Sequence, residues 1–248
     1  MKISAVLIAS IFSLALISCS KGSSDSSTSG AGTTVGVSGS LARFAATDSH
    51  LYTISNEDIK TYDISAAANP VFQSTVKLGF GIETIFPKDN NLFIGTQTGM
   101  RIMDLANPDA PKQISSFSHI RSCDPVVAND KYAFVTLRDG TDCGRGVNEL
   151  QVLDISNLNK PNLVKAYPMT RPYGLALDGN NLFVCDGGIK YYNASNVQSL
   201  ALKEKVVIEA TDLIANNGIL MVIGSDGLYQ YSYTDGTLKF LSKISTSK

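Results

Sequence analysis

The sequence is poor in the residues and short motifs that carry most enzyme chemistry. It contains no Trp and only two His in 248 residues. It has no G-x-S-x-G sequence, no Walker sequence and no zinc motif, and the loop DGTDCGRG lacks the carboxylate spacing of an EF-hand. His50 and His119 fall at different points of the repeat described below, which gives no pair of metal ligands. We therefore predict no metal site and no cofactor.

The chain has no large excess of positive or negative charge, and it shows no helical pattern. The chain carries 21 Lys and Arg against 22 Asp and Glu, for a net charge of −1. Because there is no basic patch, nucleic acid is not an expected partner. After residue 37 no segment repeats its apolar residues at the helical period, so we expect almost no helix. Hydrophobic residues at 44% and charged residues at 17% fit a well-filled β core.

What the sequence does contain is a stretch that recurs about every 40 residues. Its clearest copies are IKTYDISAAANP at 59–70, MRIMDLANPDAP at 100–111 and LQVLDISNLNKP at 150–161, and worn copies begin at Ile189 and Leu228. Aligned on the Asp position, successive copies are 41, 50, 39 and 39 residues apart. A period of this size with four strands per unit is typical of a β-propeller.

Each unit reads as four short strands separated by turns. Runs rich in Ile, Val, Phe and Tyr alternate with Gly, Asn, Asp and Pro, which is the signal of strands and turns. The second strand is apolar at nearly every position, as in 182–185 and 219–223, and this indicates burial on both sides. The sequence therefore predicts an all-β fold, a five-bladed β-propeller of four-stranded antiparallel blades. The predicted blades are residues 38–78, 79–118, 119–169, 170–209 and 210–248.

The copies begin and end in phase with the repeat. No strand is therefore left over to close the ring by exchange between the first and last blades. A blade buries its faces only against its neighbours. We expect closure to rest on side-chain packing between the first and last blades; the alternative is an open array of blades that dimerises.

The segments YDISAAANP, MDLANPDAP and LDISNLNKP resemble the LVIVD repeat of bacterial and archaeal surface propeller proteins. The resemblance covers the third strand and the following turn of three units. It implies the fold but no catalytic residue, since that family has no shared catalytic motif. Without Trp the chain cannot be a typical WD-repeat protein, and it lacks the regularly spaced Gly-Gly doublets expected of kelch blades.

The N-terminal segment predicts export and a lipid anchor. Residues 1–18 read as a signal peptide, because Lys2 is followed by an apolar stretch shorter than the ~20 residues of a membrane span. The sequence Leu-Ile-Ser-Cys resembles a lipobox, which implies lipidation of Cys19. Residues 19–37 are almost all Ser, Gly and Thr and predict a tether with a reach of roughly 25 Å. In double-membraned bacteria, an Asp directly after the lipidated Cys is the signal for the inner membrane. This chain has Ser20 there, which favours the outer membrane. The protein would then be periplasmic or surface-exposed.

Two of the other Cys are predicted to form a disulfide. Cys123 begins the first strand of the third unit, and Cys143 lies in the ten-residue insertion that lengthens this unit. In an antiparallel blade the start of the first strand lies beside the end of the second, which the insertion follows. The two side chains should therefore meet, and an exported protein permits the bond. Cys185 lies in an apolar strand and is predicted to be a small buried hydrophobe.

The face that carries the insertion is the expected ligand-binding face, at the mouth of the central channel. Alignment of the first strands places a group of charged and aromatic side chains there. Two Arg could clamp a carboxylate or sulfate; the alternative is that these charges pair with one another. The side chains predicted to line this mouth are Arg121, Arg171, Tyr173, Glu83 and Glu209, beside Asp142 and Arg145 of the insertion.

Three functions are compatible with this architecture. The first is an envelope-anchored binding or interaction module that recognises a protein, a glycan or a small anionic ligand at the mouth. The second is a hydrolase or lyase acting on an extracellular polymer at the same place, with Glu83 and either Glu209 or Asp212 as a carboxylate pair. The third is a structural component of an envelope assembly. The mouth is rich in Arg and has no His, so we favour the binding module over an enzyme.

Overall fold

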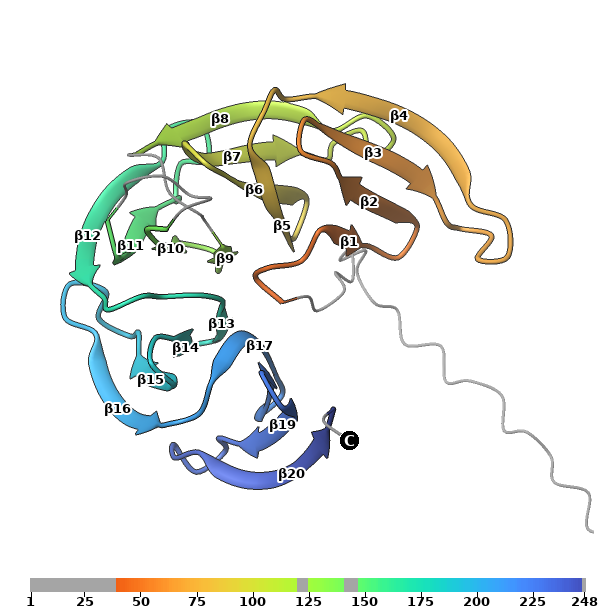
Figure 1. The fold of residues 1–248 in the computed structure, drawn as a ribbon. Helices are drawn as coiled ribbons and strands as arrows, with labels where there is room; N and C mark the ends of the chain where they lie inside the picture. The colour runs from red at the N-terminus through yellow and green to blue at the C-terminus, as the bar shows by residue number, and fades with distance from the viewer. Residues whose placement is uncertain (1–38, 120–124, 141–146, 247–248) are drawn as a thin grey trace, which may run out of the picture. The chain divides into compact units, whose positions relative to one another are not determined.

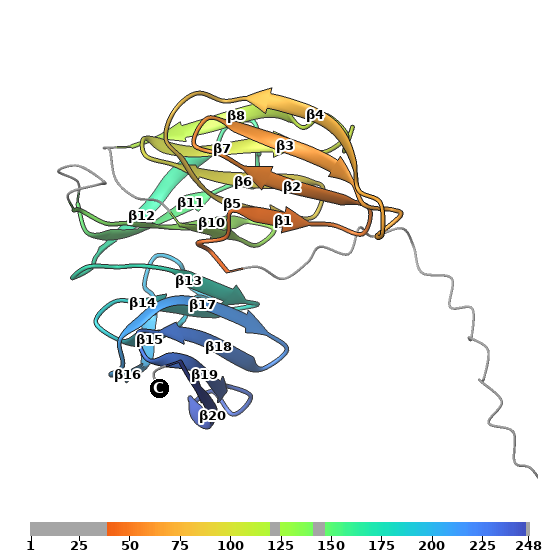
Figure 2. The ribbon, with the colours of Figure 1, turned by 45° about the vertical axis from the view of Figure 1, so that its right-hand side comes forward.

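The computed structural model describes residues 39–119, 125–140 and 147–246, and this part of the chain is all-β (Figure 1). Its strands form five sheets of four antiparallel strands, each sheet taking consecutive strands in chain order. The five sheets follow one another around a common axis as the blades of a propeller (Figures 1 and 2). The predicted five-bladed β-propeller is therefore confirmed.

The strand bounds follow the predicted units. Blade 1 contains β1 Phe44–Ala46, β2 His50–Ile54, β3 Asp58–Asp63 and β4 Val71–Lys77. Blade 2 contains β5 Ile82–Lys88, β6 Asn91–Thr96, β7 Gly99–Asp104 and β8 Lys112–Ser118. Blade 3 contains β9 Val126–Ala128, β10 Tyr132–Leu137, β11 Glu149–Asp154 and β12 Asn162–Pro168. Blade 4 contains β13 Leu175–Asp178, β14 Asn181–Cys185, β15 Ile189–Asn193 and β16 Ala201–Val206. Blade 5 contains β17 Ala210–Asn216, β18 Ile219–Gly224, β19 Gly227–Ser232 and β20 Lys239–Ser245.

The Asp of the repeat shapes the turn between the third and fourth strands. In Asp63, Asp104 and Asp154 the side-chain oxygen accepts a hydrogen bond from the backbone N–H two residues on, at 2.7, 3.0 and 2.8 Å. Asn193 does the same in blade 4 at 2.9 Å. These are Asx turns, in which a short polar side chain fixes the local backbone. The repeated Asp therefore caps the turn that follows the third strand.

Hydrophobic cores form between neighbouring blades. Among the described residues there are four such clusters, between blades 1 and 2, 2 and 3, 3 and 4, and 4 and 5. A closed ring of five blades would need a fifth cluster, between blades 5 and 1. The described part of the chain has none, and an opening separates these two blades (Figure 1). The expected closure by packing of the first and last blades is therefore wrong for this structure.

The segment just before β1 makes the contacts that cross from blade 1 to blades 4 and 5. Ser40 Oγ donates to Asp212 Oδ1 of β17 at 3.0 Å and accepts from the N–H of Leu175 in β13 at 2.8 Å. Burial raises the pKa of Asp212, although hydrogen bonds from Leu213, Ser40 and Leu41 oppose that effect. A Cβ atom at Gly174 would lie 2.2 Å from Asp212 Oδ1, so glycine is required beside this carboxylate.

Candidate functional site

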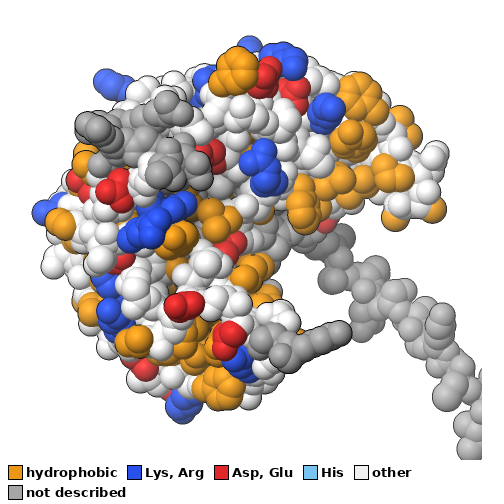
Figure 3. All heavy atoms as spheres, in the orientation of Figure 1, with side chains coloured by type: hydrophobic (Ala, Val, Ile, Leu, Met, Phe, Trp, Pro, Cys, Tyr) orange, Lys and Arg blue, Asp and Glu red, His pale blue; other side chains and the backbone are white. Residues whose placement is uncertain are grey.

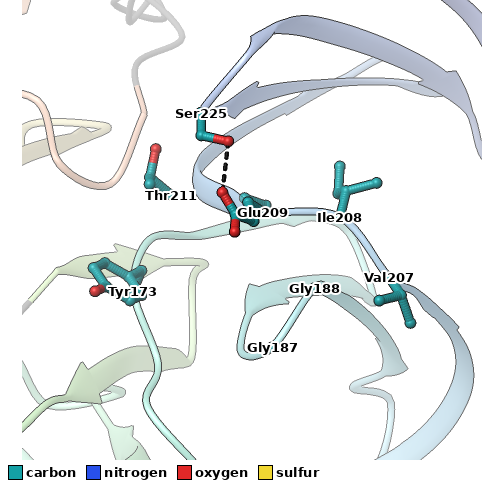
Figure 4. A pocket seen from close by; sticks show the side chains of 9 residues that line it. Tyr173, Gly187, Gly188, Val207, Ile208, Glu209, Thr211 and Ser225 are labelled. Atoms are coloured by element: carbon teal, nitrogen blue, oxygen red, sulfur yellow. Dashed lines mark hydrogen bonds between the residues drawn. The ribbon is translucent and has the colours of Figure 1, made fainter.

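A pocket of about 560 Å³ lies at the channel mouth between blades 4 and 5 (Figure 4). We call it the blade 4–5 pocket. It is bounded by the connection from β16 to β17, by the turns that follow β14 and β18, and by the segment that leads into β13. These are the connections that meet at one end of the channel, which is the face predicted from the sequence. The pocket is lined by Tyr173, Gly187, Gly188, Val207, Ile208, Glu209, Ala210, Thr211 and Ser225.

The lining is mostly apolar, with one acidic group on its wall. Val207 and Ile208 contribute aliphatic side chains, and Val207 is 81% exposed. Glu209 Oε2 accepts a hydrogen bond from Ser225 Oγ at 2.7 Å, and the backbone N–H of Ser225 donates to the carbonyl of Glu209 (Figure 4). This pairing joins the β16–β17 connection to the turn after β18. It holds the carboxylate against one side of the pocket.

Two Arg side chains lie beside the aromatic ring of Tyr173. The guanidinium carbon of Arg138 is 4.2 Å from the ring centre, and that of Arg171 is 5.8 Å away. Stacking of this kind is attractive because the ring face is electron-rich. The backbone of Tyr173 is fixed by Thr136, whose hydroxyl donates to its carbonyl at 2.6 Å. Tyr173, which lines the pocket, therefore has two guanidinium groups beside its ring, whereas Glu209 contributes a carboxylate to the lining.

Asp186 holds the segment that carries Arg171. It is 1% exposed, and its carboxylate accepts the backbone N–H of Arg171 at 2.7 Å and that of Thr170 at 3.1 Å. Lys190 Nζ donates to the same carboxylate at 2.6 Å. Burial alone would raise the pKa of Asp186, but the hydrogen bonds from Arg171, Lys190 and Thr170 outweigh it and lower the pKa. Asp186 is therefore ionised at neutral pH and positions the segment that leads to the pocket.

The structure brings three of the predicted site residues together. Tyr173 and Glu209 line the blade 4–5 pocket, and Arg171 lies beside Tyr173. Glu83 does not line it; Glu83 belongs to β5 of blade 2, and its carbonyl accepts a hydrogen bond from Arg43 at 3.4 Å. The proposed pairing of Glu83 with Glu209 in one catalytic site therefore finds no support in the pocket lining.

Several predicted residues fall outside the described part of the chain. Arg121, Asp142 and Arg145 of the predicted mouth lie there, as do both partners of the predicted Cys123–Cys143 disulfide. Cys19 lies there too. The start of the insertion is described: Asp139 Oδ1 accepts a hydrogen bond from Asn148 Nδ2 at 2.9 Å.

The sequence did not reveal every residue that shapes this site. Arg138 is the first residue of the insertion, yet its stacking on Tyr173 depends on how blades 3 and 4 meet. Asp186 follows an apolar strand and precedes the Gly187–Gly188 doublet, a pattern that indicates only a turn. Ser225 carries no signal at all, because a serine in a turn is common and its partner Glu209 belongs to a connection elsewhere in the blade.

His50 and Cys185 have structural surroundings in the part of the chain that the structure describes. Within residues 39–119, 125–140 and 147–246 no three His, Cys, Asp or Glu side chains gather as a metal site. His50 is occupied structurally, with Nε2 2.8 Å from Asp109 Oδ1 and Nδ1 2.8 Å from Ser49 Oγ. Cys185 is buried, as predicted, and burial raises the pKa of its thiol. The described part of the chain also has no helix long and apolar enough to cross a membrane.

The comparison with known families agrees with the repeat seen in the sequence. The LVIVD repeat family model matches residues 121–169, which include the strands of blade 3. The chain is thus a five-bladed β-propeller that carries an LVIVD repeat, and the predicted resemblance is confirmed. The sequence matches no curated protein at a significant level.

Solved structures share the fold at low sequence identity. A protein from Lactobacillus plantarum gives a TM-score of 0.62 at 15% identity, covering 79% of this chain and 67% of its own. The periplasmic gluconolactonase PpgL of Pseudomonas aeruginosa gives 0.59 at 12%, covering 79% and 67%. BamB from Moraxella catarrhalis gives 0.56 at 16%, covering 88% and 65%. At such identities the likeness shows the fold alone, and this chain spans about two thirds of the length of these neighbours.

Proposed function

We propose that this protein is an envelope-anchored binding module whose ligand site is the blade 4–5 pocket. The observation that carries the proposal is the pocket itself, a largely apolar hollow of about 560 Å³ at the channel mouth. Pockets of this size, apolar with a few placed polar groups, are the usual form of small-molecule sites. Predicted site residues from two separate connections, Tyr173 and Glu209, line it.

The ligand class that fits best is a small organic anion with an apolar body. The aliphatic wall at Val207 and Ile208 would cover the apolar part. Arg138 and Arg171, stacked on Tyr173, present guanidinium groups that bind carboxylate or sulfate through paired hydrogen bonds. The Glu209–Ser225 pair on the opposite wall disfavours a second negative charge and would accept a hydroxyl or amide hydrogen from the ligand.

A hydrolase or lyase at this mouth is less well supported. Glycoside cleavage by the common route needs two carboxyl groups that flank one bond. Among the described residues that line the pocket, Glu209 is the single carboxylate. Asp212, the other proposed partner, is buried against Ser40 and is occupied in holding the segment before β1.

The anchor is the second half of the proposal. The lipobox-like sequence before Cys19, the Ser/Gly/Thr-rich tether to residue 37 and Ser20 support lipidation and an outer-membrane location. A Cys19→Ala variant should lose incorporation of labelled palmitate and appear in the soluble fraction. A Ser20→Asp variant should keep the label but move to the inner membrane. Continued labelling of Cys19→Ala would contradict the anchor and leave the pocket untouched.

A matched pair of probes tests the pocket. Octanoate and octylamine have the same apolar chain and opposite charge, so their affinities for the full-length protein, measured by calorimetry in detergent, separate charge from apolar contact. We expect octanoate to bind at least about tenfold more tightly, which corresponds to ~1.4 kcal/mol. The double variant Arg138→Ala/Arg171→Ala should remove that preference, while Leu202→Ala on the outer strand β16 should not. Tighter binding of octylamine would place the ligand's charge on Glu209 and overturn the anion proposal. If octanoate and octylamine bind equally well and Ile208→Asp does not weaken either, the probes bind outside the blade 4–5 pocket.

A further inference from the structure

Every blade has two faces, and two of the ten have no neighbouring blade in the part of the chain that the structure describes. We call the face turned to the preceding blade the leading face and the one turned to the following blade the trailing face. The leading face of blade 1 carries Phe44, Leu51, Thr53 and Tyr62, and the trailing face of blade 5 carries Ile214, Met221, Ile223 and Gln230. Both border the opening, where hydrophobic side chains gather over blade 1 (Figures 1 and 3).

The leading face of blade 1 has the residue types of a buried interface without the burial. Phe44 is 60% exposed. The residues at its position in the other blades, identified by strand register, are 0 or 1% exposed. Leu51 and Tyr62 are likewise only partly buried, whereas the counterparts of Leu51 are fully buried in all other blades and those of Tyr62 are buried in blades 2, 3 and 5. The counterparts of Phe44 are Ile85, Val126, Leu175 and Leu213.

The trailing face of blade 5 shows the same contrast. Ile223 is 49% exposed, whereas Ile54, Thr136 and Cys185 at the same position are 8, 0 and 0% exposed. Met221 is only partly buried, although its position holds a fully buried aromatic ring in each of the other blades. Those rings are Tyr52, Phe93, Phe134 and Phe183.

Exposure on the outermost strands does not explain this contrast. The second residue of the fourth strand is exposed in interior and terminal blades alike, at 46% for Leu163, 54% for Leu202 and 58% for Phe240. Such residues face solvent wherever they occur. The inner strands differ only in the two terminal blades, so the missing neighbour is the cause.

A hydrogen bond between blades also lacks its partner at the opening. Ser74 of blade 1 donates to the carbonyl of Asp109 in the repeat turn of blade 2, and Ser115 of blade 2 donates to that of Leu158 in blade 3, each at 2.5 Å. The equivalent residue of blade 5 is Ser242, which donates to Gln230 of its own sheet at 3.0 Å. In the equivalent turn of blade 1, residues 65–70 are all exposed. The chain thus carries both halves of one more blade-to-blade contact.

We propose that a second copy of this chain covers these faces, head to tail, with the trailing face of blade 5 against the leading face of the partner's blade 1. We choose a second copy of this chain as the partner because each of the four interfaces already formed joins a trailing face to a leading face of this same repeat. In addition, Ser242 is equivalent to the Ser residues that donate to a repeat turn of the next blade, and the turn of residues 65–70 is such a turn. Because the two surfaces differ, the contact is heterologous. Successive copies form a closed ring if the rotation between neighbouring copies brings the last one back to the first, and otherwise they form an open chain.

Cysteine cross-linking of full-length protein in membranes tests this arrangement. Between blades 1 and 2, the residues equivalent to Thr53 and Met221 are Ile94 and Tyr52, and these two belong to the same hydrophobic cluster. Thr53 and Met221 should therefore lie close together in the proposed contact. Two differently tagged variants, Thr53→Cys and Met221→Cys, are co-expressed and oxidised. We expect a heterodimer containing both tags, absent when either variant is paired with Leu202→Cys. Adding Phe44→Glu to the first variant should reduce the heterodimer at least about fivefold, whereas adding Leu163→Glu should not.

The double variant Thr53→Cys/Met221→Cys in one chain separates the alternatives. If this chain closes its own ring, the double variant forms an internal bond and migrates faster as a monomer, and the co-expressed pair gives no heterodimer. That result overturns the proposal in favour of closure within one chain. Absence of both products, with the thiols fully reactive toward maleimide, overturns it as well and leaves the faces uncovered or covered by a different protein.

Discussion

The boundary between blades 4 and 5 and the opening between blades 5 and 1 are bordered by the same kinds of face, with opposite results. At the first, Phe183 is fully buried and stacks on Tyr191, with ring centres 4.6 Å apart, and the blade 4–5 pocket lies at its mouth. At the second, Met221 occupies the position of Phe183 and is only partly buried. The difference teaches that a blade's pattern specifies an interface but cannot supply the neighbour that completes it.

The largest expected effect comes from truncating the completed interface. Phe183→Ala should lower the free energy of unfolding by about 3–5 kcal/mol, because it leaves a cavity among rings that cannot collapse around it. Phe44→Ala at the opening should cost less than about 1 kcal/mol in dilute solution, since this side chain is mostly exposed. Urea denaturation of both variants measures the contrast. Equal costs at the lowest protein concentration would mean that the blade 1 face is covered within the chain.

Gly174→Ala should produce the next largest effect. A Cβ atom there would lie 2.2 Å from Asp212 Oδ1 and 2.8 Å from the Asp212 Cα, so the backbone of β17 must shift. We expect a loss of about 1–3 kcal/mol, typical of overpacking. Gly79→Ala is the matched control, since nothing lies within 4 Å of its Cβ position although its φ is +85°. It should cost only the left-handed strain of about 1 kcal/mol. Thermal melts that rank Gly79→Ala as the worse variant would refute the tight packing at Asp212.

Asp186→Asn should have a moderate effect on stability and a clear one on the pocket. The Asn amide keeps one acceptor oxygen but has no negative charge to attract Lys190 and to accept from the two backbone N–H groups. The free energy of unfolding should therefore fall by about 1–3 kcal/mol. Because the folded pKa of Asp186 is lowered, its stabilisation is present above the unfolded value of about 3.9 and is lost as pH falls through the folded pKa. Octanoate binding should weaken as the Arg171 segment loosens. Unchanged binding, with the stability loss intact, would separate Asp186 from the site.

The sequence predicted what depends on the repeat. The 40-residue period, the five four-stranded blades and the buried Cys185 all follow from local pattern and composition. Glu83 was placed at the mouth by aligning strands, and that alignment cannot tell which of five equivalent positions faces a hollow. The blade 4–5 pocket forms where the β16–β17 connection and the Gly187–Gly188 turn leave space, which is a property of tertiary packing.

The sequence offered an open array only as the alternative to a closed ring, and it could not decide between the two for a different reason. Five copies in phase predict five blades, but whether the ring closes depends on the angle that each core sets between neighbouring sheets. That angle is fixed by the sizes of packed side chains, such as the rings at the positions of Tyr52 and Phe93. The contact of Ser40 with Asp212 joins segments 172 residues apart, and neither residue carries a local signal of it.

The smallest predicted effect concerns this contact and has a distinctive pH dependence. Burial raises the pKa of Asp212, so the folded chain binds its proton more tightly than the unfolded chain does. By linkage, its contribution is greatest below the unfolded value of about 3.9 and is lost as pH rises through the raised folded pKa. The unfolding free energy of the wild type minus that of Asp212→Asn should therefore decline as pH rises and then level off. The corresponding difference for Asp186→Asn should rise over the same range, because the pKa of that group is lowered. Urea titrations from about pH 3.5 to 7 compare the two slopes, and a shared sign would show that Asp212 is not desolvated beside Ser40.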